Sequence, residues 1–257
     1  MCRHAADRIA ASGLAYHPVM VGVVAIVQAR MSSTRLPGKS MADVGGEPML
    51  ALLVRRLQHA EEIERIVVAT STEAEDDAIE VVARASGCAV YRGSRDDVLA
   101  RFVGAAEGAS GALVRVTGDC PLIDPGVVDE VIRLFHDTPG CAYASNIEPR
   151  TYPDGLDVEV LSPEILRWAA AEADDPRDRE HVTTVIRREL PRLPSTALIC
   201  EEQLGELRWT VDTCDDLEFI RQVVERLGAR RHEARMPEIL QAVRTAPSLA
   251  SFRGRRG

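Results

Sequence analysis

The chain has 257 residues, of which 46% are hydrophobic and 28% charged, a balance that supports a sizeable core in one large α/β domain or two small ones. Its formal net charge of −9 argues against broad nucleic-acid binding, so no nucleic-acid partner is expected. The six cysteines form no CxxC pair, which is typical of reduced thiols in a cytoplasmic protein and unlike a zinc site or a disulfide framework.

The two ends of the chain are predicted to be flexible. Residues 1–20 lack the continuous apolar region of a signal peptide, and Met20 is an alternative start of translation. The longest apolar run, 19–27, is too short to span a bilayer, so no membrane association is expected. We therefore expect a flexible extension over 1–20, one domain over 21–246 and a flexible tail over 247–257.

The first predicted element is a buried parallel strand over 21–27, followed by the loop 29–39 with the sequence ARMSSTRLPGK. Open α/β sheets bind their ligands at the carboxyl ends of their strands, where this loop lies. Its hydroxyls and its cations Arg30, Arg35 and Lys39 suit a polyphosphate on a protein that is otherwise acidic. The alternative is a solvated basic loop without a ligand.

The end of this loop, Gly38-Lys39-Ser40, superficially resembles a Walker A motif. The first glycine of that motif would fall at position 33, which is Ser33. A Walker loop also runs directly into a helix, whereas two glycines and Pro48 follow here within ten residues. The sequence therefore disfavours a P-loop NTPase.

Strands and helices then alternate, which predicts right-handed βαβ units and a mostly parallel sheet. A capping box of Thr72 and Glu75 is expected to open the second helix. The predicted elements are a helix over 48–60, a strand over 65–69, a helix from the capping box towards Gly87, a strand over 88–91, a helix over 96–107 and a strand over 112–116.

Two aspartates follow the strand 112–116. Asp124 and Pro125 are predicted as the N-cap and first turn of a helix that ends near Phe135, so Asp124 has a structural role. Asp119 has no such role and lies where a carboxylate faces the crevice beside the basic loop. The alternative for Asp119 is an ordinary turn residue.

The pattern changes over 141–162, which is predicted as an arm that contacts the acceptor or a second subunit. Alternation over 156–160 indicates a half-exposed strand with Asp157 and Glu159 on one face. These carboxylates are either ligands for substrate hydroxyls or merely solvated. Helices are predicted from Ser162 and over 178–190.

The last predicted strand, 207–211, ends in Asp212, a second carboxylate free to face the crevice. Thr213 is expected to cap the next helix, with Asp215 and Asp216 in its first turn, where the helix dipole favours negative charge. A last short helix is predicted over 238–243.

Three ordered motifs in residues 22–228 give the chain a family resemblance. ARMSSTRLPGK resembles the signature of sugar-acid cytidylyltransferases, especially 3-deoxy-manno-octulosonate cytidylyltransferase and more distantly acylneuraminate cytidylyltransferase. VTGDCPLID and VDTCDDLE resemble that family's metal-binding segments. GLDVEV and REHVT are similar to the spore coat polysaccharide biosynthesis F branch, whose substrates are less uniform.

The resemblance implies a three-layer α/β/α, Rossmann-like nucleotidyltransferase fold. It also implies the reaction of the family, a Mg²⁺-dependent transfer of CMP from CTP to an acidic sugar or a phosphonate or phosphate acceptor, with release of pyrophosphate. It also implies a homodimer. The resemblance implies that the catalytic residues Arg30 and Lys39 contact the triphosphate, with Ser33, Arg35 and Asp119 beside it. The other implied nucleotide-binding residues are Gln28 and Ala29 near the cytosine, and Gly93 and Ser94 near the ribose. Asp119 and Asp212 would hold the metal, and Asp157 and Glu159 are the candidates for the acceptor.

Two other functions stay open at this point. The first is a sugar-1-phosphate nucleotidylyltransferase that uses another nucleoside triphosphate. The second is a non-catalytic nucleotide-binding protein of a surface-glycan pathway. A protein that only binds a nucleotide need not keep both metal-binding carboxylates. The presence of Asp119 and Asp212 together with the cations Arg30 and Lys39 therefore disfavours the non-catalytic alternative.

Overall fold

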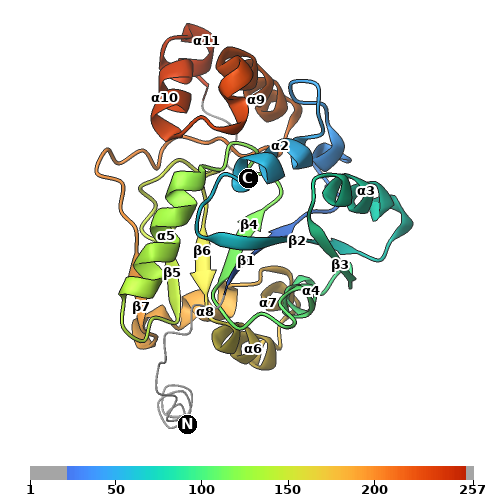
Figure 1. Ribbon diagram of the computed structural model, residues 1–257, viewed down its shortest axis with the longest axis vertical. Coiled ribbons are helices and arrows are strands. Elements are labelled where there is room, and N and C mark those ends of the chain that lie inside the picture. The colour runs from blue at the N-terminus through green and yellow to red at the C-terminus, as the bar shows by residue number, and fades with distance from the viewer. Residues whose placement is uncertain (1–21, 253–257) are drawn as a thin grey trace.

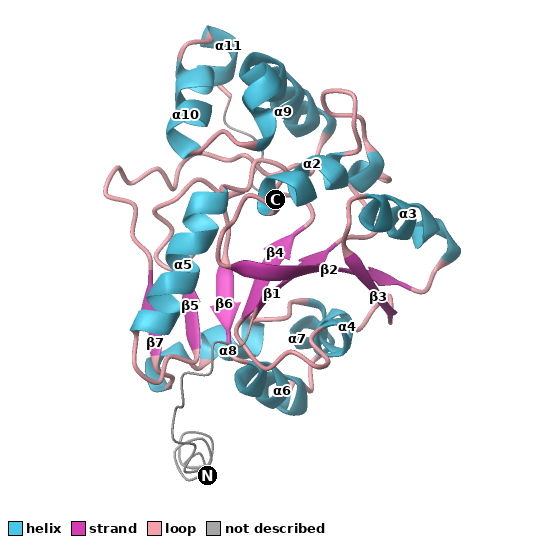
Figure 2. Ribbon diagram, in the orientation of Figure 1, coloured by secondary structure: helices cyan, strands magenta, loops and turns pink. Residues whose placement is uncertain are grey.

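The computed structural model describes residues 22–252 and shows a sheet of seven strands between two layers of helices (Figures 1 and 2). The strand order is β3-β2-β1-β4-β6-β5-β7. The strands are β1 (Val23–Gln28), β2 (Ile63–Ser71), β3 (Ala89–Gly93), β4 (Leu113–Thr117), β5 (Tyr143–Ser145), β6 (Glu159–Leu161) and β7 (Ser195–Ala197). The predicted extension over 1–20 lies outside the described residues, as do residues 253–257 of the predicted tail.

The first four strands run parallel, as predicted. β1 pairs with both β2 and β4, and β2 pairs with β3. β6 is antiparallel to both β4 and β5, and β5 is parallel to β7. The alternating α/β pattern thus predicted the parallel half of the sheet, whereas β5 and β7, of three residues each, were not predicted as strands.

Two hydrophobic cores cover the two faces of the sheet. The first core packs α2 (Met49–Leu57), α3 (Asp77–Ala85), α5 (Pro125–Asp137), α9 (Cys214–Leu227), α10 (Met236–Arg244) and α11 (Pro247–Ala250). The second packs α4 (Val98–Ala105), α6 (Pro163–Glu172) and α8 (Thr184–Arg188), with α7 (Pro176–Glu180) beside α4. Among residues 22–252 no helix is both long and apolar enough to cross a membrane.

Several helix caps follow the sequence. Asp124 accepts hydrogen bonds from the amides of Gly126 and Val127 at the start of α5, and Ser162 accepts from Ile165 at the start of α6. Thr213 forms a capping box with Asp216 at the start of α9. These caps confirm the predicted starts of three helices.

Other predicted elements were wrong in detail. The capping box of Thr72 and Glu75 does not form, because the Thr72 amide, from which Glu75 would accept, donates instead to the Gly93 carbonyl at 3.0 Å. The predicted helix over 178–190 is two helices, α7 and α8, because His181 leaves the helical conformation.

The carboxyl-terminal segment also differs from the prediction. The expected last helix, 238–243, is the core of α10, but α11 follows it within the predicted flexible tail. Leu249 is buried in the first core, and the ring of Phe252 stacks on Phe219 with centroids 4.5 Å apart. Apolar side chains with a place in the core thus order the tail as far as residue 252.

The segment 141–162 is part of the sheet, since it supplies β5 and β6. β6 lies between β4 and β5, so the predicted half-exposed strand is buried and begins only at Glu159. The connection over 146–158 projects from the sheet towards the loop that precedes α9 (Figure 1).

The predicted strand over 207–211 is extended backbone without a ladder. It makes one isolated bridge, between Asp154 and Arg208. In this bridge the Trp209 amide donates to the Asp154 carbonyl, and further along the segment the Val211 amide donates to the Asp119 carbonyl at 2.9 Å. This segment therefore lies across the carboxyl end of β4, where it delivers Asp212.

Candidate active site

The loop 29–39 is held in a compact turn after β1. The Met31 carbonyl accepts from the amides of Ser33 and Gly38, both at 2.9 Å, and the Met31 amide donates to the Asp76 carboxylate at 2.7 Å. Gly38 has a φ of 74°, a left-handed conformation that glycine adopts without a Cβ penalty. The loop is thereby folded so that Lys39 follows directly in a short 3₁₀ turn, η1 (Lys39–Met41).

The ammonium group of Lys39 joins two carboxylates that are distant in the sequence. Its Nζ lies 3.0 Å from Asp212 Oδ1, 3.4 Å from Asp119 Oδ2 and 2.6 Å from the Val211 carbonyl oxygen. The Lys39 side chain is only 13% exposed, so these charges interact with little screening by solvent. The first strand, the fourth strand and the start of α9 thus meet at one cation.

Asp119 reaches this point because Gly118 allows β4 to approach β1 closely. The Gly118 amide donates to the Gln28 carbonyl at 2.9 Å. A Cβ on Gly118 would lie 2.7 Å from that carbonyl oxygen and 3.2 Å from the Ala29 Cβ. A side chain at position 118 would therefore displace Asp119 from the loop.

The charge state of Asp119 reflects two opposing effects. Burial raises the pKa of this carboxyl, but the nearby Lys39 ammonium and hydrogen bonds from Thr117 and Lys39 lower it more. The pKa of Asp119 consequently lies below its usual value, and the group is a carboxylate at neutral pH.

Asp212 is fixed by its position just before α9. Its Oδ2 accepts from the buried Arg208 at 2.6 Å, its Oδ1 pairs with Arg35 at 3.0 Å, and its amide donates to Asp216 at 3.0 Å. Arg208 also pairs with Asp216 at 2.7 Å. The capping box of α9 and a buried guanidinium thus aim Asp212 at Lys39.

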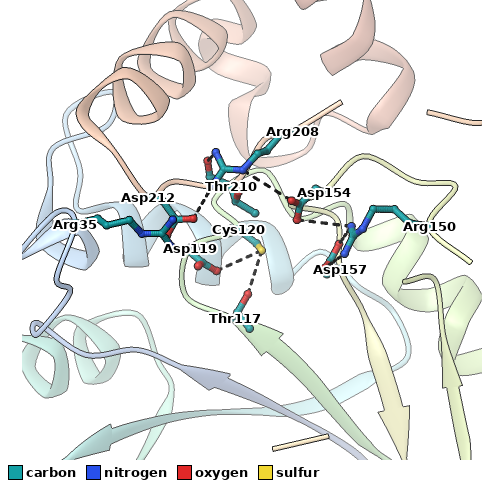
Figure 3. A pocket seen from close by; sticks show the side chains of 10 residues that line it. All are labelled: Arg35, Thr117, Asp119, Cys120, Arg150, Asp154, Asp157, Arg208, Thr210 and Asp212. Atoms are coloured by element: carbon teal, nitrogen blue, oxygen red, sulfur yellow. Dashed lines mark hydrogen bonds and ion pairs between the residues drawn. The ribbon is translucent and has the colours of Figure 1, made fainter. Parts of the chain in front are cut away.

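A cavity of about 580 Å³ opens beside this cluster (Figure 3). Asp119 and Asp212 lie at one end of it in Figure 3, and Arg150 and Asp157 lie at the other. The lining side chains are three arginines, four aspartates, two threonines and a cysteine: Arg35, Arg150, Arg208, Asp119, Asp154, Asp157, Asp212, Thr117, Thr210 and Cys120. A wall of this composition suits a polar ligand with several hydrogen-bonding groups.

At the far end of the cavity, Arg150 holds Asp157 through two hydrogen bonds of 2.8 and 2.9 Å. Asp154 is bound less tightly: its carboxylate lies 3.6 Å from Arg150 and 3.9 Å from Arg208, both too long for hydrogen bonds. Burial and the charge of Asp157 raise the pKa of Asp154. Asp154 therefore has capacity to accept hydrogen bonds from a ligand.

Glycine again permits the close packing on which this end of the cavity depends. Gly155 has a φ of 115°, and a Cβ there would lie 2.7 Å from the Trp209 carbonyl carbon and 2.9 Å from the Thr210 amide nitrogen. The loop that carries Asp154 and the segment that carries Arg208 can therefore lie side by side.

The structure does not bring all predicted site residues to the Lys39 cluster. Arg30 pairs with Glu180 of α7 at 3.6 Å, so it lies towards the α4 and α7 side of the sheet. Ser33 accepts a hydrogen bond from Leu36 within the loop. Gly93 and Ser94 lie at the end of β3, which is two strands away from β1.

Glu159, a predicted acceptor ligand, lies inside the protein and does not line the cavity. Its side chain is 2% exposed and pairs with Arg115, and it accepts a hydrogen bond from the Tyr143 hydroxyl at 2.7 Å. The alternation of 156–160 suggested one face for Asp157 and Glu159, but only Asp157 precedes the strand and stays in the cavity. We therefore assign Glu159 to the core of the sheet.

Sequence reasoning did not assign six residues of the cavity to the site: Thr117, Cys120, Arg150, Asp154, Arg208 and Thr210. Arg150, Asp154 and Asp157 are closely spaced in a segment that Pro153 and Gly155 exclude from regular secondary structure. Charges concentrated in such a loop could have indicated a ligand-binding site. Arg208 and Thr210 gave none, because their segment matches an ordinary strand.

A parallel α/β sheet with a cationic loop after its first strand, and two carboxylates facing that loop, defines a nucleotidyltransferase-like α/β protein. A profile of the Cytidylyltransferase family matches residues 24–230. The chain belongs to this family and is a nucleotidyltransferase of the kind that uses CTP.

Individual relatives agree with this assignment. The chain is 31% identical to the spore coat polysaccharide biosynthesis protein SpsF of Bacillus subtilis, over 91% of this chain and 99% of that protein. It is 31% identical to a 3-deoxy-manno-octulosonate cytidylyltransferase of Geobacter sulfurreducens, over 76% and 89%. A solved cytidylyltransferase structure from Leptospira borgpetersenii superposes with a TM-score of 0.86 at 28% identity, covering 92% of this chain and all of that one.

Proposed function

We propose that this protein transfers CMP from CTP to an acidic sugar or to a phosphonate or phosphate acceptor, with Mg²⁺ as cofactor and pyrophosphate as the second product. The observation that carries the proposal is the meeting of Asp119 and Asp212 at the ammonium of Lys39. The names of the relatives, a sugar-acid cytidylyltransferase and a polysaccharide biosynthesis protein, support an acidic sugar as acceptor.

The donor set fits magnesium. Asp119 and Asp212 already share one cation, and Mg²⁺ prefers one or two carboxylates with phosphate oxygens and water. Among the described residues no group of three or more acidic, histidine or cysteine side chains is arranged for a metal, so a metal here would take its remaining ligands from the triphosphate and water. When bound, Mg²⁺ supplies charge neutralisation of the triphosphate.

The reaction needs positioning and charge compensation more than covalent catalysis. An oxygen of the acceptor forms a bond to the α-phosphorus, the bond from that phosphorus to the bridging oxygen breaks, and pyrophosphate leaves with the electron pair. Lys39, Arg35 and Arg30 carry the positive charge of the loop. At an effective dielectric constant near 20, each cation about 4 Å from a phosphate oxygen contributes on the order of 4 kcal/mol.

The cavity beyond Asp119 and Asp212 is the proposed acceptor site. It adjoins the two carboxylates, and Arg150, Asp154 and Asp157 lie at its far end. Asp154 and the hydroxyls of Thr117 and Thr210 offer hydrogen bonds to a polyol. Asp157 keeps its proposed acceptor role, whereas Glu159 is not carried forward.

The test is turnover. The protein is incubated with CTP, MgCl₂ and a panel of sugar acids, phosphonates and phosphates; pyrophosphate release and the mass of the CMP conjugate are followed. Asp119→Asn and Lys39→Met should each lower the rate by about 10²–10³, the effect of losing one preorganised charge in such a site. Asp215→Asn, at an exposed position in the first turn of α9, is the matched control and should keep the rate.

Full activity in either variant would contradict the assigned roles. Larger thermal stabilisation by UTP, GTP or TTP than by CTP would favour the other nucleotidylyltransferase, because mass action rewards the tightest binder. Binding of CTP without turnover on the whole panel would favour a non-catalytic protein. Light scattering tests the proposed homodimer, in which the connection 146–158 is the candidate contact.

A further inference from the structure

Two arginines of the cavity already hold aspartates with their guanidinium groups. The two terminal nitrogens of Arg150 donate to the two carboxylate oxygens of Asp157, at 2.8 and 2.9 Å. Those of Arg208 donate to Asp216 at 2.7 Å and to Asp212 at 2.6 Å. A guanidinium recognises an acid group through this fork of N–H donors. Both forks are occupied, so neither arginine is open to an acid group of the acceptor.

Asp154 lies between these two arginines without a hydrogen bond to either of them (Figure 3). Its carboxylate oxygens lie 3.6 Å from Arg150 and 3.9 Å from Arg208. Its side chain is 31% exposed on the wall of the cavity. Because an ionised carboxylate has about four acceptor positions, Asp154 can accept several hydrogen bonds from a ligand. Burial and the charge of Asp157 raise its pKa, which shows that its surroundings disfavour its negative charge.

Formal charge is balanced at one end of the cavity and not at the other. Three cations and three carboxylates meet at or just behind the near end, where the proposed metal ligands lie: Arg35, Lys39, Arg208, Asp119, Asp212 and Asp216. At the far end Arg150 faces two carboxylates, Asp154 and Asp157. Since Asp157 takes both hydrogen bonds of Arg150, the unbalanced negative charge lies at Asp154. A hydroxyl group would donate to Asp154, but a cation would also balance this charge.

We propose that the acceptor carries an amino group, which donates to Asp154 as an ammonium at the far end of the cavity. The inference rests on the proposed function and narrows the substrate class to a sugar acid, phosphonate or phosphate that also bears an amine. An ammonium has three N–H donors and a positive charge, so it supplies both the hydrogen bonds and the charge that Asp154 lacks. The oxygen that attacks the α-phosphorus then lies at the near end, beside Asp119 and Asp212. A cavity of about 580 Å³ is of the size that holds small-molecule substrates.

The experiment compares pairs of acceptors that differ in one group, an amine or a hydroxyl at the same position. 2-Aminoethylphosphonate is paired with 2-hydroxyethylphosphonate, and an amino sugar acid is paired with the sugar acid that has a hydroxyl in place of the amine. Pyrophosphate release gives kcat and KM for each acceptor at pH 7, on the full chain with saturating CTP and MgCl₂. In kcat/KM the wild type should prefer the amine by at least about tenfold, the factor that a hydrogen bond between charged groups supplies.

Asp154→Asn keeps the size of the side chain and one acceptor oxygen but removes the charge. It should raise the KM by about 10²-fold for the amine and by about tenfold for the alcohol, so the preference falls to within about threefold. Asp215→Asn is the matched control, because it makes the same change at an exposed position of α9 that does not line this cavity. It should keep the wild-type preference.

The outcomes separate this inference from the proposed function. If the wild type uses the alcohols as well as the amines, or better, the inference is overturned and the proposed function stands. The same conclusion follows if Asp154→Asn keeps the wild-type preference for the amine. If CTP and MgCl₂ give no pyrophosphate with any acceptor, the proposed function is overturned and the inference with it.

Discussion

Among single residues, Glu159 shows how burial changes the role of a carboxylate. The sequence suggested a ligand of the acceptor, but the side chain is enclosed with Arg115 and Tyr143 and its pKa is lowered. A carboxyl group whose pKa is lower in the folded than in the unfolded chain stabilises the protein at any pH above its unfolded pKa, which is about 4.3 for glutamate. This stabilisation is lost as the pH falls through the pKa of the folded state.

The corresponding prediction concerns stability. Glu159→Gln leaves Arg115 without its partner and should lower the free energy of unfolding at pH 7 by about 3–5 kcal/mol. The difference from wild type should shrink as the pH falls below about 4.3. Urea denaturation across this pH range measures it; wild-type stability with a raised KM for the acceptor would restore the acceptor role.

Asp154 is the opposite case, a cavity carboxylate held only by ion pairs longer than hydrogen bonds. Asp154→Asn should raise the KM for any accepted acceptor by about tenfold, the value of a lost hydrogen bond to a charged group, and should leave the KM for CTP unchanged. Steady-state kinetics with each substrate varied in turn checks this. An equal effect on both constants would mean that Asp154 only supports the fold of the loop.

Among the elements, α9 matters because its N-terminus presents Asp212. Thr213 caps α9 and Ser162 caps α6, each by accepting from a backbone amide. Thr213→Ala and Ser162→Ala should each cost about 1 kcal/mol of stability. Only Thr213→Ala should also lower kcat/KM, because the Thr213 hydroxyl donates to the same Asp216 oxygen that accepts from the Asp212 amide. If the two variants lost the same stability and had the same kcat/KM, the cap of α9 would not be needed to position Asp212.

The close approach of β1 and β4 at their carboxyl ends gives a second prediction at this scale. Gly118→Ala places a Cβ only 2.7 Å from the Gln28 carbonyl oxygen and should cost about 1–3 kcal/mol of stability and most of the activity. Gly46→Ala is the comparison: its φ is 86° and no atom lies within 4 Å of the added Cβ. It should cost about 1 kcal/mol through backbone strain alone and keep the activity of the enzyme.

For the whole molecule, the packing of the carboxyl-terminal segment decides whether residues 247–252 are a tail or part of the core. Leu249 is 3% exposed in α11. Leu249→Ala should lower the free energy of unfolding by about 2–4 kcal/mol, whereas Ser248→Ala, on the exposed side of the same helix, should have little effect. Thermal and urea denaturation of the two variants compares them; equal stabilities would support the predicted flexible tail.

The sequence by itself determined the parallel half of the sheet, the caps at Asp124, Ser162 and Thr213, and the candidacy of Lys39, Asp119 and Asp212. These features depend on local patterns: apolar runs, turn residues, and charges placed directly after strands. The tertiary structure alone decided that Glu159 is buried, that 207–211 lies beyond the carboxyl end of β4 instead of joining the sheet, and that Arg150, Asp154 and Arg208 line a cavity. Which neighbours a carboxylate or a segment meets depends on contacts between residues far apart in the chain, and no local pattern records those contacts.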